Sequence, residues 1–243
     1  MRTGSEWRHL IERVIAERGF RLVRQPVLAC ADSRLLHHEV FLRVPDPDTA
    51  GQTIAAAVLM PMAENAGLAT SVDRAVIDTV LRGLAAGDYP ASVAVNLSPS
   101  SLPDDALLNW LASTLATQRD LARCLILEFP EYGAALQLEQ LSVWTERLRP
   151  LGVRFALDHF GKGFSSFAYL RATKLDLLKV DGSFVRELHQ QGDNRFFART
   201  VADIAHSLDM QVVAEAVESE ADWLALRQLG IDGGRGYWLG RPE

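Results

Sequence analysis

The chain has 243 residues, of which 48% are apolar and 23% are charged, and its formal net charge is −6. This composition is typical of a globular protein with enough apolar material for a large core. Because no basic block accompanies the acidic balance, the sequence argues against non-specific binding to nucleic acid or to an acidic membrane. No DNA or RNA polymer is therefore expected as a partner.

The sequence shows neither a signal peptide nor an apolar run long enough to span a membrane, which predicts a cytoplasmic location. Its two cysteines, Cys30 and Cys124, lie in apolar runs without CxxC or metal-ligand spacing. We therefore expect both thiols to be reduced and buried in the core.

A leading amphipathic helix is predicted at about residues 5–18, where apolar residues recur on one face: Trp7, Leu10, Ile11, Val14 and Ile15. Two strand-like runs follow at residues 20–28 and 35–44. The polar link between them is short, whereas a parallel crossover needs about a dozen residues or more. The two runs are therefore expected to form an antiparallel pair.

Prolines and Gly51 then mark a loop, after which helices are expected at residues 59–66 and 71–86. Ser71 is a candidate N-cap of the second helix, because its hydroxyl can accept a hydrogen bond from the first turn. From there strands and helices alternate. The strands are predicted at residues 92–98, 124–130, 153–160, 175–181, 211–217 and 233–240, and the helices at 104–117, 136–148, 166–170, 194–208 and 220–229.

Each later strand is a nearly unbroken run of Val, Ile and Leu, as expected of strands buried on both faces. The alternation predicts an α/β fold in one domain over residues 1–243. This fold is a (β/α)8 TIM-like barrel from about residue 20, with an atypical antiparallel first strand pair. The alternative is a doubly wound open sheet, although no Gly-rich phosphate turn supports it.

Polar residues recur at or near the C-terminal ends of the predicted strands, namely Asn96, Glu128, Asp158, Lys179, Asp181 and Glu215, and the second strand-like run adds Glu39. Such barrels assemble their sites on this face. Each residue alone could be a turn cap, an ion-pair partner or a solvated charge, but together they favour a functional site, since an unpaired buried carboxylate is costly. Carboxylate and amide oxygens suit a hard divalent cation, and a lysine beside them suits a phosphate or an activated water.

Several motifs stand in one order along nearly the whole chain, from RQPVL to GYWLGRP: HEVFLR, LMPMAENAGL, VNLS, LEFPE, LDHFGKGFSS, LKVDGSFV, VVAEAVE and GRGYW. In order and spacing they resemble the EAL domain family, whose members bind and usually hydrolyse cyclic di-GMP. The resemblance implies that two metal ions clamp a phosphodiester and the attacking water in active members.

The resemblance also implies roles for individual residues. The first metal would be held by Glu39, Asn96, Glu128 and Asp158. Lys179 would orient the nucleophilic water, Glu215 would transfer a proton or support the second metal, Asp181 would support the metal shell, and Glu131 would fasten the loop at residues 161–166. The dinucleotide would be contacted by Gln25, Glu39, Phe41, Leu42, Arg43, Asn96, Asp158, Asp181, Glu218 and Arg235, with Arg43 on a phosphate.

Four positions depart from the family pattern: His159 stands for the second of two adjacent Asp, Lys162 for a Thr, Ala216 for a Gly and Arg235 for a Gln. A neutral imidazole at His159 would remove a negative charge and would prefer softer cations than magnesium. Lys162 and Arg235 add positive charge, which could retain an anionic ligand without a second metal.

These departures predict a cyclic di-GMP-binding receptor or signalling domain with impaired catalysis, similar to LapD-type receptors. It would need no metal, or one divalent cation such as Mg²⁺, Mn²⁺ or Ca²⁺. Two alternatives stay open: a slow or metal-selective phosphodiesterase that gives the linear dinucleotide, and a docking scaffold that binds no nucleotide. The resemblance further implies a homodimer through residues 166–171 and neighbouring segments. It also implies further domains of a parent protein, for which an inner-membrane receptor with this module in the cytoplasm is one form.

Overall fold

The computed structural model describes residues 2–163 and 169–243. The leading helix is confirmed as α1 (Gly4–Glu17), which buries Leu10, Ile11 and Val14. It begins with a capping box: the Thr3 hydroxyl accepts a hydrogen bond from the Glu6 backbone N–H, and the Glu6 carboxylate accepts one from the Thr3 N–H. These contacts satisfy two N–H groups that the helix itself leaves without partners.

The first strand pair is antiparallel, as predicted. Strand β1 (Arg21–Ala29) pairs with β2 (Leu35–Pro45), and Gln25 lies opposite Glu39. A short edge strand, β3 (Thr53–Ala55), adds to the outer end of β2 where the sequence predicts only a loop. Three residues are too few to show the alternation that marks a strand.

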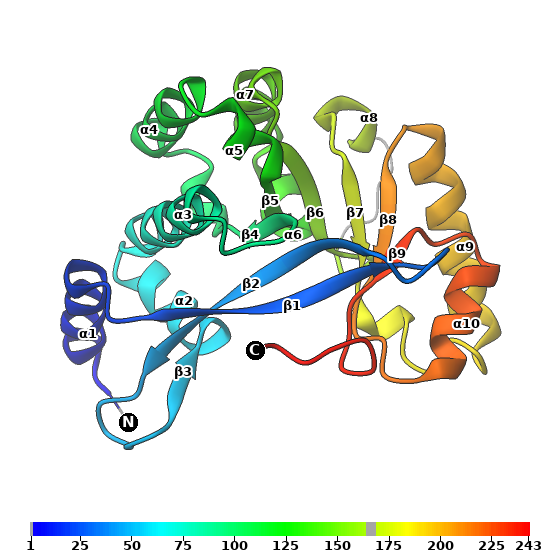
Figure 1. The fold of residues 1–243 in the computed structure, drawn as a ribbon, viewed down its shortest axis with the longest axis horizontal. Coiled ribbons are helices and arrows are strands. Elements are labelled where there is room, and N and C mark those ends of the chain that lie inside the picture. The colour runs from blue at the N-terminus through cyan, green and yellow to red at the C-terminus, as the bar shows by residue number, and fades with distance from the viewer. Residues whose placement is uncertain (1, 164–168) are drawn as a thin grey trace.

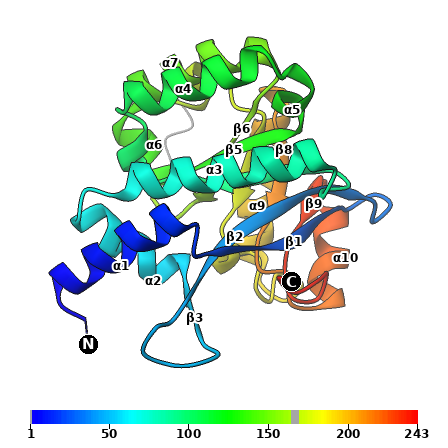
Figure 2. The same ribbon diagram turned by 60° about the vertical axis from the view of Figure 1, so that its left-hand side comes forward.

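Two helices follow, α2 (Ala56–Asn65) and α3 (Ala69–Ala86), and both pack against α1 (Figures 1 and 2). The prediction that Ser71 caps α3 is wrong. The helix begins two residues earlier, with Leu68 at the N-cap position and without a side-chain cap hydrogen bond. Burial of Ala69 and Val72 on the inner face accounts for the earlier start, since apolar packing outweighs the roughly 1 kcal/mol of a cap.

The sheet closes on itself. Its order is β1-β9-β8-β7-β6-β5-β4-β2-β3, and the pairing of β1 with β2 completes the ring. The pairs from β2–β4 through to β8–β9 are parallel, while β1 runs antiparallel to both of its neighbours. The later strands are β4 (Ser92–Asn96), β5 (Leu125–Pro130), β6 (Arg154–Phe160), β7 (Leu177–Val180), β8 (Gln211–Ala214) and β9 (Gly233–Gly234). The predicted barrel with an antiparallel first pair is thus confirmed.

Helices surround the barrel, with α3 to α7 on one side in Figure 1 and α9 and α10 on the other. They are α4 (Asp105–Ala116), α5 (Arg119–Cys124), α6 (Glu131–Leu136), α7 (Leu138–Leu148), α8 (Leu170–Thr173), α9 (Gly192–Ser207) and α10 (Glu220–Gln228). The helix predicted at residues 136–148 is α7, with α6 as a separate helix before it. The helix predicted at residues 166–170 falls mostly outside the described residues.

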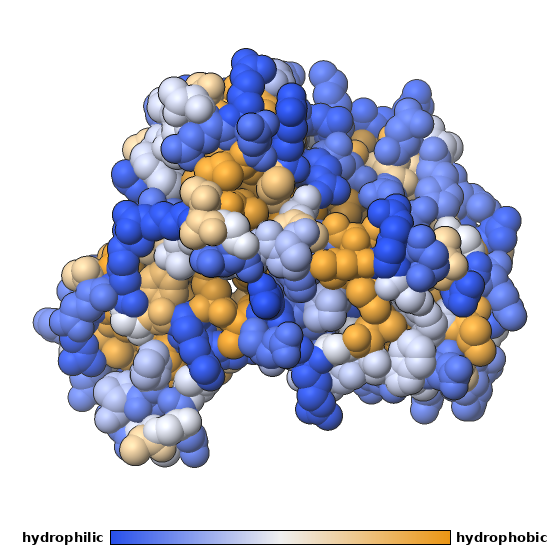
Figure 3. Space-filling view, in the orientation of Figure 1, coloured by the Kyte–Doolittle hydropathy of each residue, from blue (hydrophilic) through white to orange (hydrophobic). Residues whose placement is uncertain are grey.

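Neither cysteine is paired. Cys30 is buried as predicted, whereas Cys124 is only half-buried at the end of α5, so its predicted place in the core is wrong. In the part of the chain that the structure describes, no helix combines the length and apolar character that crossing a membrane requires. On the face drawn in Figure 3, apolar residues show in separate patches among hydrophilic ones.

The barrel interior is built in two layers. One layer is apolar and consists of Val27, Ala94, Ile126, Ala156, Leu177 and Val213. Two residues along from each of these stands a polar residue: Gln25, Asn96, Glu128, Asp158, Lys179 and Glu215. Because side chains alternate across a strand with a period of two, both residues of each pair point to the same face. The polar residues therefore form a ring above an apolar floor.

Candidate functional site

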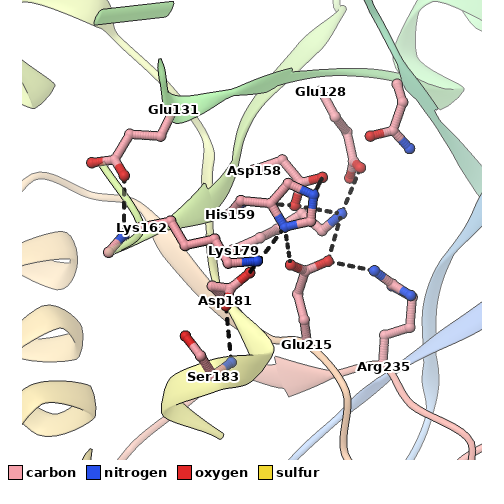
Figure 4. Close-up of polar contacts among 12 residues, drawn as sticks. Glu128, Glu131, Asp158, His159, Lys162, Lys179, Asp181, Ser183, Glu215 and Arg235 are labelled. Carbon is pink, nitrogen blue, oxygen red and sulfur yellow. Dashed lines mark hydrogen bonds and ion pairs between the residues drawn. The ribbon is translucent and has the colours of Figure 1, made fainter. Parts of the chain in front are cut away.

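The ammonium group of Lys179 lies at the centre of this ring. Its Nζ is 2.6 Å from Glu128 Oε2, 2.9 Å from Glu39 Oε2, 3.1 Å from Asp158 Oδ1 and 3.5 Å from Glu215 Oε1, and the side chain is 0% exposed (Figure 4). Burial by itself would lower the pKa of Lys179, but the surrounding carboxylates outweigh it and raise that pKa well above its usual value. Lys179 is therefore a permanent cation in this state.

Asp158 and His159 are adjacent in β6, yet both reach the site. The register with β7 shifts between Leu157 and Phe160, and His159 has a left-handed backbone with φ 57°. A bulge of this kind re-aims a side chain that regular pleating would point away. His159 Nδ1 then lies 2.9 Å from Glu215 Oε2 and 3.2 Å from Asp181 Oδ2.

The environment of His159 favours the protonated form of its ring. Its hydrogen bond to Glu215 raises its pKa to about 9, against the opposing effect of partial burial. The sequence alone suggests a neutral imidazole at this position, whereas the contacts with Glu215 and Asp181 favour an imidazolium. An imidazolium has no lone pair for a metal and instead presents a positive charge to Glu215.

Arg235 follows β9 directly and enters the same ring. Its Nη2 pairs with Glu215 Oε1, its Nε lies 2.7 Å from Glu39 Oε2, and its Nη1 donates to Gln25 Oε1 at 3.1 Å. The guanidinium carbon lies 5.3 Å from the centre of the Phe41 ring. Arg235 is 16% exposed and bridges two carboxylates, which distinguishes it from a solvated surface charge.

The buried carboxylates differ in their tendency to hold a proton. Burial, reinforced by Glu39, raises the pKa of Glu128 well above its usual value, and burial raises the pKa of Asp158 to about 6. Burial by itself would raise the pKa of Glu215, but Lys179 and the hydrogen bond from His159 outweigh burial, so the pKa of Glu215 is lowered. Lys179 and Arg235 likewise outweigh burial and lower the pKa of Glu39.

The residues present fit one divalent cation better than two. Oxygens of Glu39, Glu128 and Asp158 lie within 4.8 Å of one another, and Oε1 of Glu128 is buried without a hydrogen-bond partner. Together with Asn96, which donates to Glu39 Oε1 at 2.9 Å, this set could hold an oxygen-liganded ion. The second set, Asp158, His159 and Glu215, is equally close, but an imidazole nitrogen suits a hard cation less well than a carboxylate oxygen does.

A cleft opens above the ring in two compartments, of 430 Å³ and 370 Å³, which share Phe41, His159 and Arg235 in their walls. The first compartment is also lined by Gln25, Arg43, Lys162, Asp181, Glu218 and Tyr237. The second is more apolar and is also lined by Glu39, Leu42, Met60, Val72, Asn96 and Asp158. Each residue predicted to contact the dinucleotide thus lines one compartment or both, and its role there stays a prediction.

A buried carboxylate anchors the loop beside the cleft. Oε2 of Glu131 accepts hydrogen bonds from the backbone N–H groups of Gly161 at 3.1 Å and Gly163 at 3.0 Å. Its Oε1 accepts one from the Tyr169 hydroxyl at 3.1 Å. The predicted loop spans residues 161–166, of which 164–166 lie outside the described residues. Lys162, at the tip of the described part, lies 3.0 Å from Asp181 Oδ2.

Two tyrosines of this region were not predicted from the sequence. Tyr169 supports Glu131, and Tyr237 lines the first compartment while 60% exposed. Tyr237 lies inside the strand predicted at residues 233–240, and its place in the GRGYW motif is the signal that could have indicated it. No comparable signal marks Tyr169, whose hydroxyl meets Glu131 only through the fold.

Comparison with known proteins gives consistent results. A family model described as the EAL domain matches residues 8–242. The cyclic di-GMP phosphodiesterase PdeF of Escherichia coli K12 is 31% identical over 236 residues, which are 96% of this chain and 31% of that protein. The cyclic di-GMP phosphodiesterase NbdA of Pseudomonas aeruginosa is 34% identical over 223 residues, 90% of this chain and 28% of that protein. The chain thus spans about a third of the length of these relatives.

Solved structures agree. The crystal structure of the FimX EAL domain from Pseudomonas aeruginosa bound to c-di-GMP superposes with a TM-score of 0.89 at 30% identity, covering 98% of this chain and 96% of that one. The c-di-GMP complex of the PaMucR phosphodiesterase superposes with a TM-score of 0.87 at 29% identity, covering 97% of this chain and 96% of that one. LapD from Vibrio cholerae, at 22% identity and covering 98% and 57%, shares the fold with a TM-score of 0.89.

Proposed function

Because this chain belongs to the EAL domain family, we propose that it binds cyclic di-GMP in the two-compartment cleft and acts as a receptor module with impaired hydrolysis. One observation carries the proposal: the position that the family resemblance assigns to a second metal-binding Asp holds His159, whose Nδ1 lies 2.9 Å from Glu215 Oε2. The ligand-binding half is supported by relatives that are named for this dinucleotide.

The cleft has suitable chemistry for a dianionic dinucleotide. Its compartments, of 430 Å³ and 370 Å³, are each large enough for one purine base. His159 and Arg235 lie between them, where the phosphates would pass. A phosphate about 4 Å from a bare carboxylate would be repelled by roughly 4 kcal/mol at an effective dielectric constant of 20. The cationic side chains offset this repulsion.

The same contacts disfavour hydrolysis. In a two-metal mechanism both cations stabilise the in-line displacement, one at the attacking oxygen and one at the leaving oxygen. Glu215 would accept a proton in such a reaction, but its lowered pKa and its bonds to His159 and Arg235 make it a weak base. Lys179, held as an ammonium ion, can donate a hydrogen bond but cannot accept a proton.

An enzymatic role is the second candidate. It is favoured by the complete first metal set and by the unpaired Oε1 of Glu128, which offers a free ligand atom to one cation. Under this alternative the chain would be a slow or metal-selective phosphodiesterase that opens the ring to the linear dinucleotide.

The proposal also covers the longer protein to which this domain would belong. We place residues 1–243 as one EAL module of a longer protein on the cytoplasmic side, where it would act as a homodimer and report ligand binding to other domains. The existence of other domains is supported because this chain spans about a third of the length of each of these relatives. Ligand can shift such an assembly only through a difference in affinity between its states.

Calorimetric titration of cyclic di-GMP tests the proposal, first in EDTA and then with Mg²⁺ or Mn²⁺, followed by chromatography of the nucleotide. A receptor binds saturably and leaves the ligand intact with every metal. Linear product with either ion establishes the enzymatic alternative, and absence of binding under all conditions refutes both. Arg43→Gln in the cleft should weaken binding at least tenfold. The matched variant Arg34→Gln, on the exposed β1–β2 turn, should not.

A further inference from the structure

Arg235 places a cation against two carboxylates, each of which belongs to a set that could ligate a metal ion. Its guanidinium lies between Glu39 and Glu215, which come from β2 and from the end of β8, and contacts one oxygen of each. Figure 4 shows the side chain pointing into the carboxylate cluster beside Lys179. These two carboxylates therefore have a positive partner that the protein itself supplies.

The guanidinium is held rigidly. The backbone N–H of Arg235 donates to Ala214 at 2.8 Å, and its carbonyl accepts from Val217 at 3.0 Å. The next residue, Gly236, packs so closely that a Cβ there would overlap the backbone of Val217. The Phe41 ring and Gln25 hold the side chain itself. Preorganisation of this kind lowers the entropic cost of meeting an anion.

A divalent cation would compete with this arrangement. The set that fits one ion includes Glu39, and Arg235 Nε already lies 2.7 Å from Oε2 of that carboxylate. The cluster contains four carboxylates, Glu39, Glu128, Asp158 and Glu215, against the fixed cations Lys179 and Arg235. Removal of the guanidinium would leave Glu39 with Lys179 as its remaining charged partner among the described residues.

We infer that Arg235 is an internal counter-cation that takes the place of a divalent metal between Glu39 and Glu215 and makes ligand binding independent of metal. Its exclusion of metal follows from the carboxylate contacts alone. The role of Arg235 in ligand binding rests on the proposed function, because it assumes that a phosphate of the dinucleotide lies above the guanidinium.

Arg235→Gln removes the charge and keeps a polar side chain of moderate length, and Arg235→Lys keeps the charge but loses the planar fork. The matched control is Arg241→Gln, which makes the same change at an exposed arginine that stacks on Tyr237 and is nearby in sequence. Folding of each variant is verified by thermal denaturation, and Arg235→Lys serves if the glutamine variant does not fold.

The first readout is Mn²⁺ alone, titrated into each protein and followed by the electron paramagnetic resonance signal of the free ion. We expect Arg235→Gln to bind Mn²⁺ at least tenfold more tightly than the wild type and Arg235→Lys to lie between them. Arg241→Gln should match the wild type. Equal Mn²⁺ affinity in the wild type and in both Arg235 variants overturns the metal-exclusion half of the inference.

The second readout is cyclic di-GMP affinity in EDTA and in Mn²⁺. The affinity of the wild type for cyclic di-GMP should differ less than threefold between the two conditions. The affinity of Arg235→Gln should be at least tenfold lower than that of the wild type in EDTA and should recover with Mn²⁺. An Arg235→Gln protein that binds as tightly as the wild type in EDTA overturns the ligand half. A wild type that binds no cyclic di-GMP at all refutes the proposed function, and the Mn²⁺ titration still decides metal exclusion separately.

Discussion

Nδ1 of His159 lies 2.9 Å from Oε2 of Glu215, and this single contact sets a basic ring against the carboxylate that a second metal would need. The contact depends on the backbone as much as on the side chain, since only the bulge in β6 brings His159 to this side of the barrel. The identity of the residue at position 159 should therefore decide between ligand binding and turnover.

Replacing the histidine by aspartate should raise turnover. His159→Asp exchanges a cation for a carboxylate that can ligate a second metal, so we expect at least a tenfold faster release of linear dinucleotide in Mn²⁺ or Mg²⁺, or about 1.4 kcal/mol of barrier. His159→Asn is the control, because asparagine also tolerates the left-handed backbone but brings no charge. If neither variant gains activity, the block to hydrolysis lies elsewhere, with Arg235 as the next position to change.

Lys179→Met should destabilise the fold strongly. The variant removes the ammonium ion that pairs with Glu39, Glu128 and Asp158, which leaves buried carboxylates without their partner. Breaking a buried ion pair from one side costs about 3–5 kcal/mol. Urea unfolding at pH 7 measures the loss, with Lys174→Met, at an exposed lysine, as the control. A loss below about 1 kcal/mol would show that the carboxylates take up protons instead.

Asp73 should make the fold less stable as pH rises from about 4 to 7. This buried carboxyl has its pKa raised to about 7 by burial, so in this range the folded chain retains a proton that the unfolded chain releases. The free energy of unfolding then falls with pH by at most about 1.4 kcal/mol per unit, and the decline ends above pH 7.

Chemical unfolding of Asp73→Asn and of the wild type between pH 4 and 8 measures this effect, because the substitution removes the titrating group. The free energy of unfolding of Asp73→Asn minus that of the wild type should rise with pH up to about pH 7 and then stay constant. Ser101→Ala is the matched control. In the wild type the Ser101 hydroxyl donates to Asp73 at 2.6 Å and thereby lowers the pKa of that carboxyl. Without this hydroxyl the pKa should be higher, so the free energy of unfolding should keep falling to a higher pH. A difference between Asp73→Asn and the wild type that does not change with pH would contradict the assignment.

Glu131→Gln should loosen the loop next to the cleft without unfolding the barrel. The carboxylate accepts two backbone N–H groups at one oxygen, and a neutral amide accepts them more weakly. Trypsin should then cut after Lys162 at least fivefold faster, while the midpoint of thermal unfolding falls by only a few degrees. Glu139→Gln, at an exposed position on α7, should leave the cleavage rate unchanged. Unchanged cleavage in both variants would refute the anchoring role of Glu131.

Much of the fold follows from local sequence pattern. Continuous apolar runs indicated the barrel strands, and the short link after β1 indicated an antiparallel pair. Polar residues at strand ends, such as Asn96 and Lys179, could be placed in the site because parallel strands end at one face. The edge strand β3 and the short helices α5 and α6 were not predicted, since none is long enough to show a period. The prediction of a strand at residues 233–240 is wrong beyond Gly233–Gly234.

The charge state of the site could not be predicted in the same way. The protonation of His159 depends on distances to Glu215 and Asp181, which lie on other strands, and on a bulge that leaves no mark in the sequence. The bridging position of Arg235 depends equally on contacts across the barrel. Residue types therefore indicated a changed site, while the direction of each contact needed the structure.

The two-layer interior has a consequence for how chains of this kind can vary. Each ring residue stands two positions from an apolar floor residue, as Lys179 does from Leu177, so inserting or deleting one residue in a strand would turn the ring residue outward and an outer apolar residue inward. Substitution leaves that geometry intact. Conversion between a hydrolysing and a merely binding barrel should therefore occur through exchanges of single side chains, with the lengths of the strands preserved.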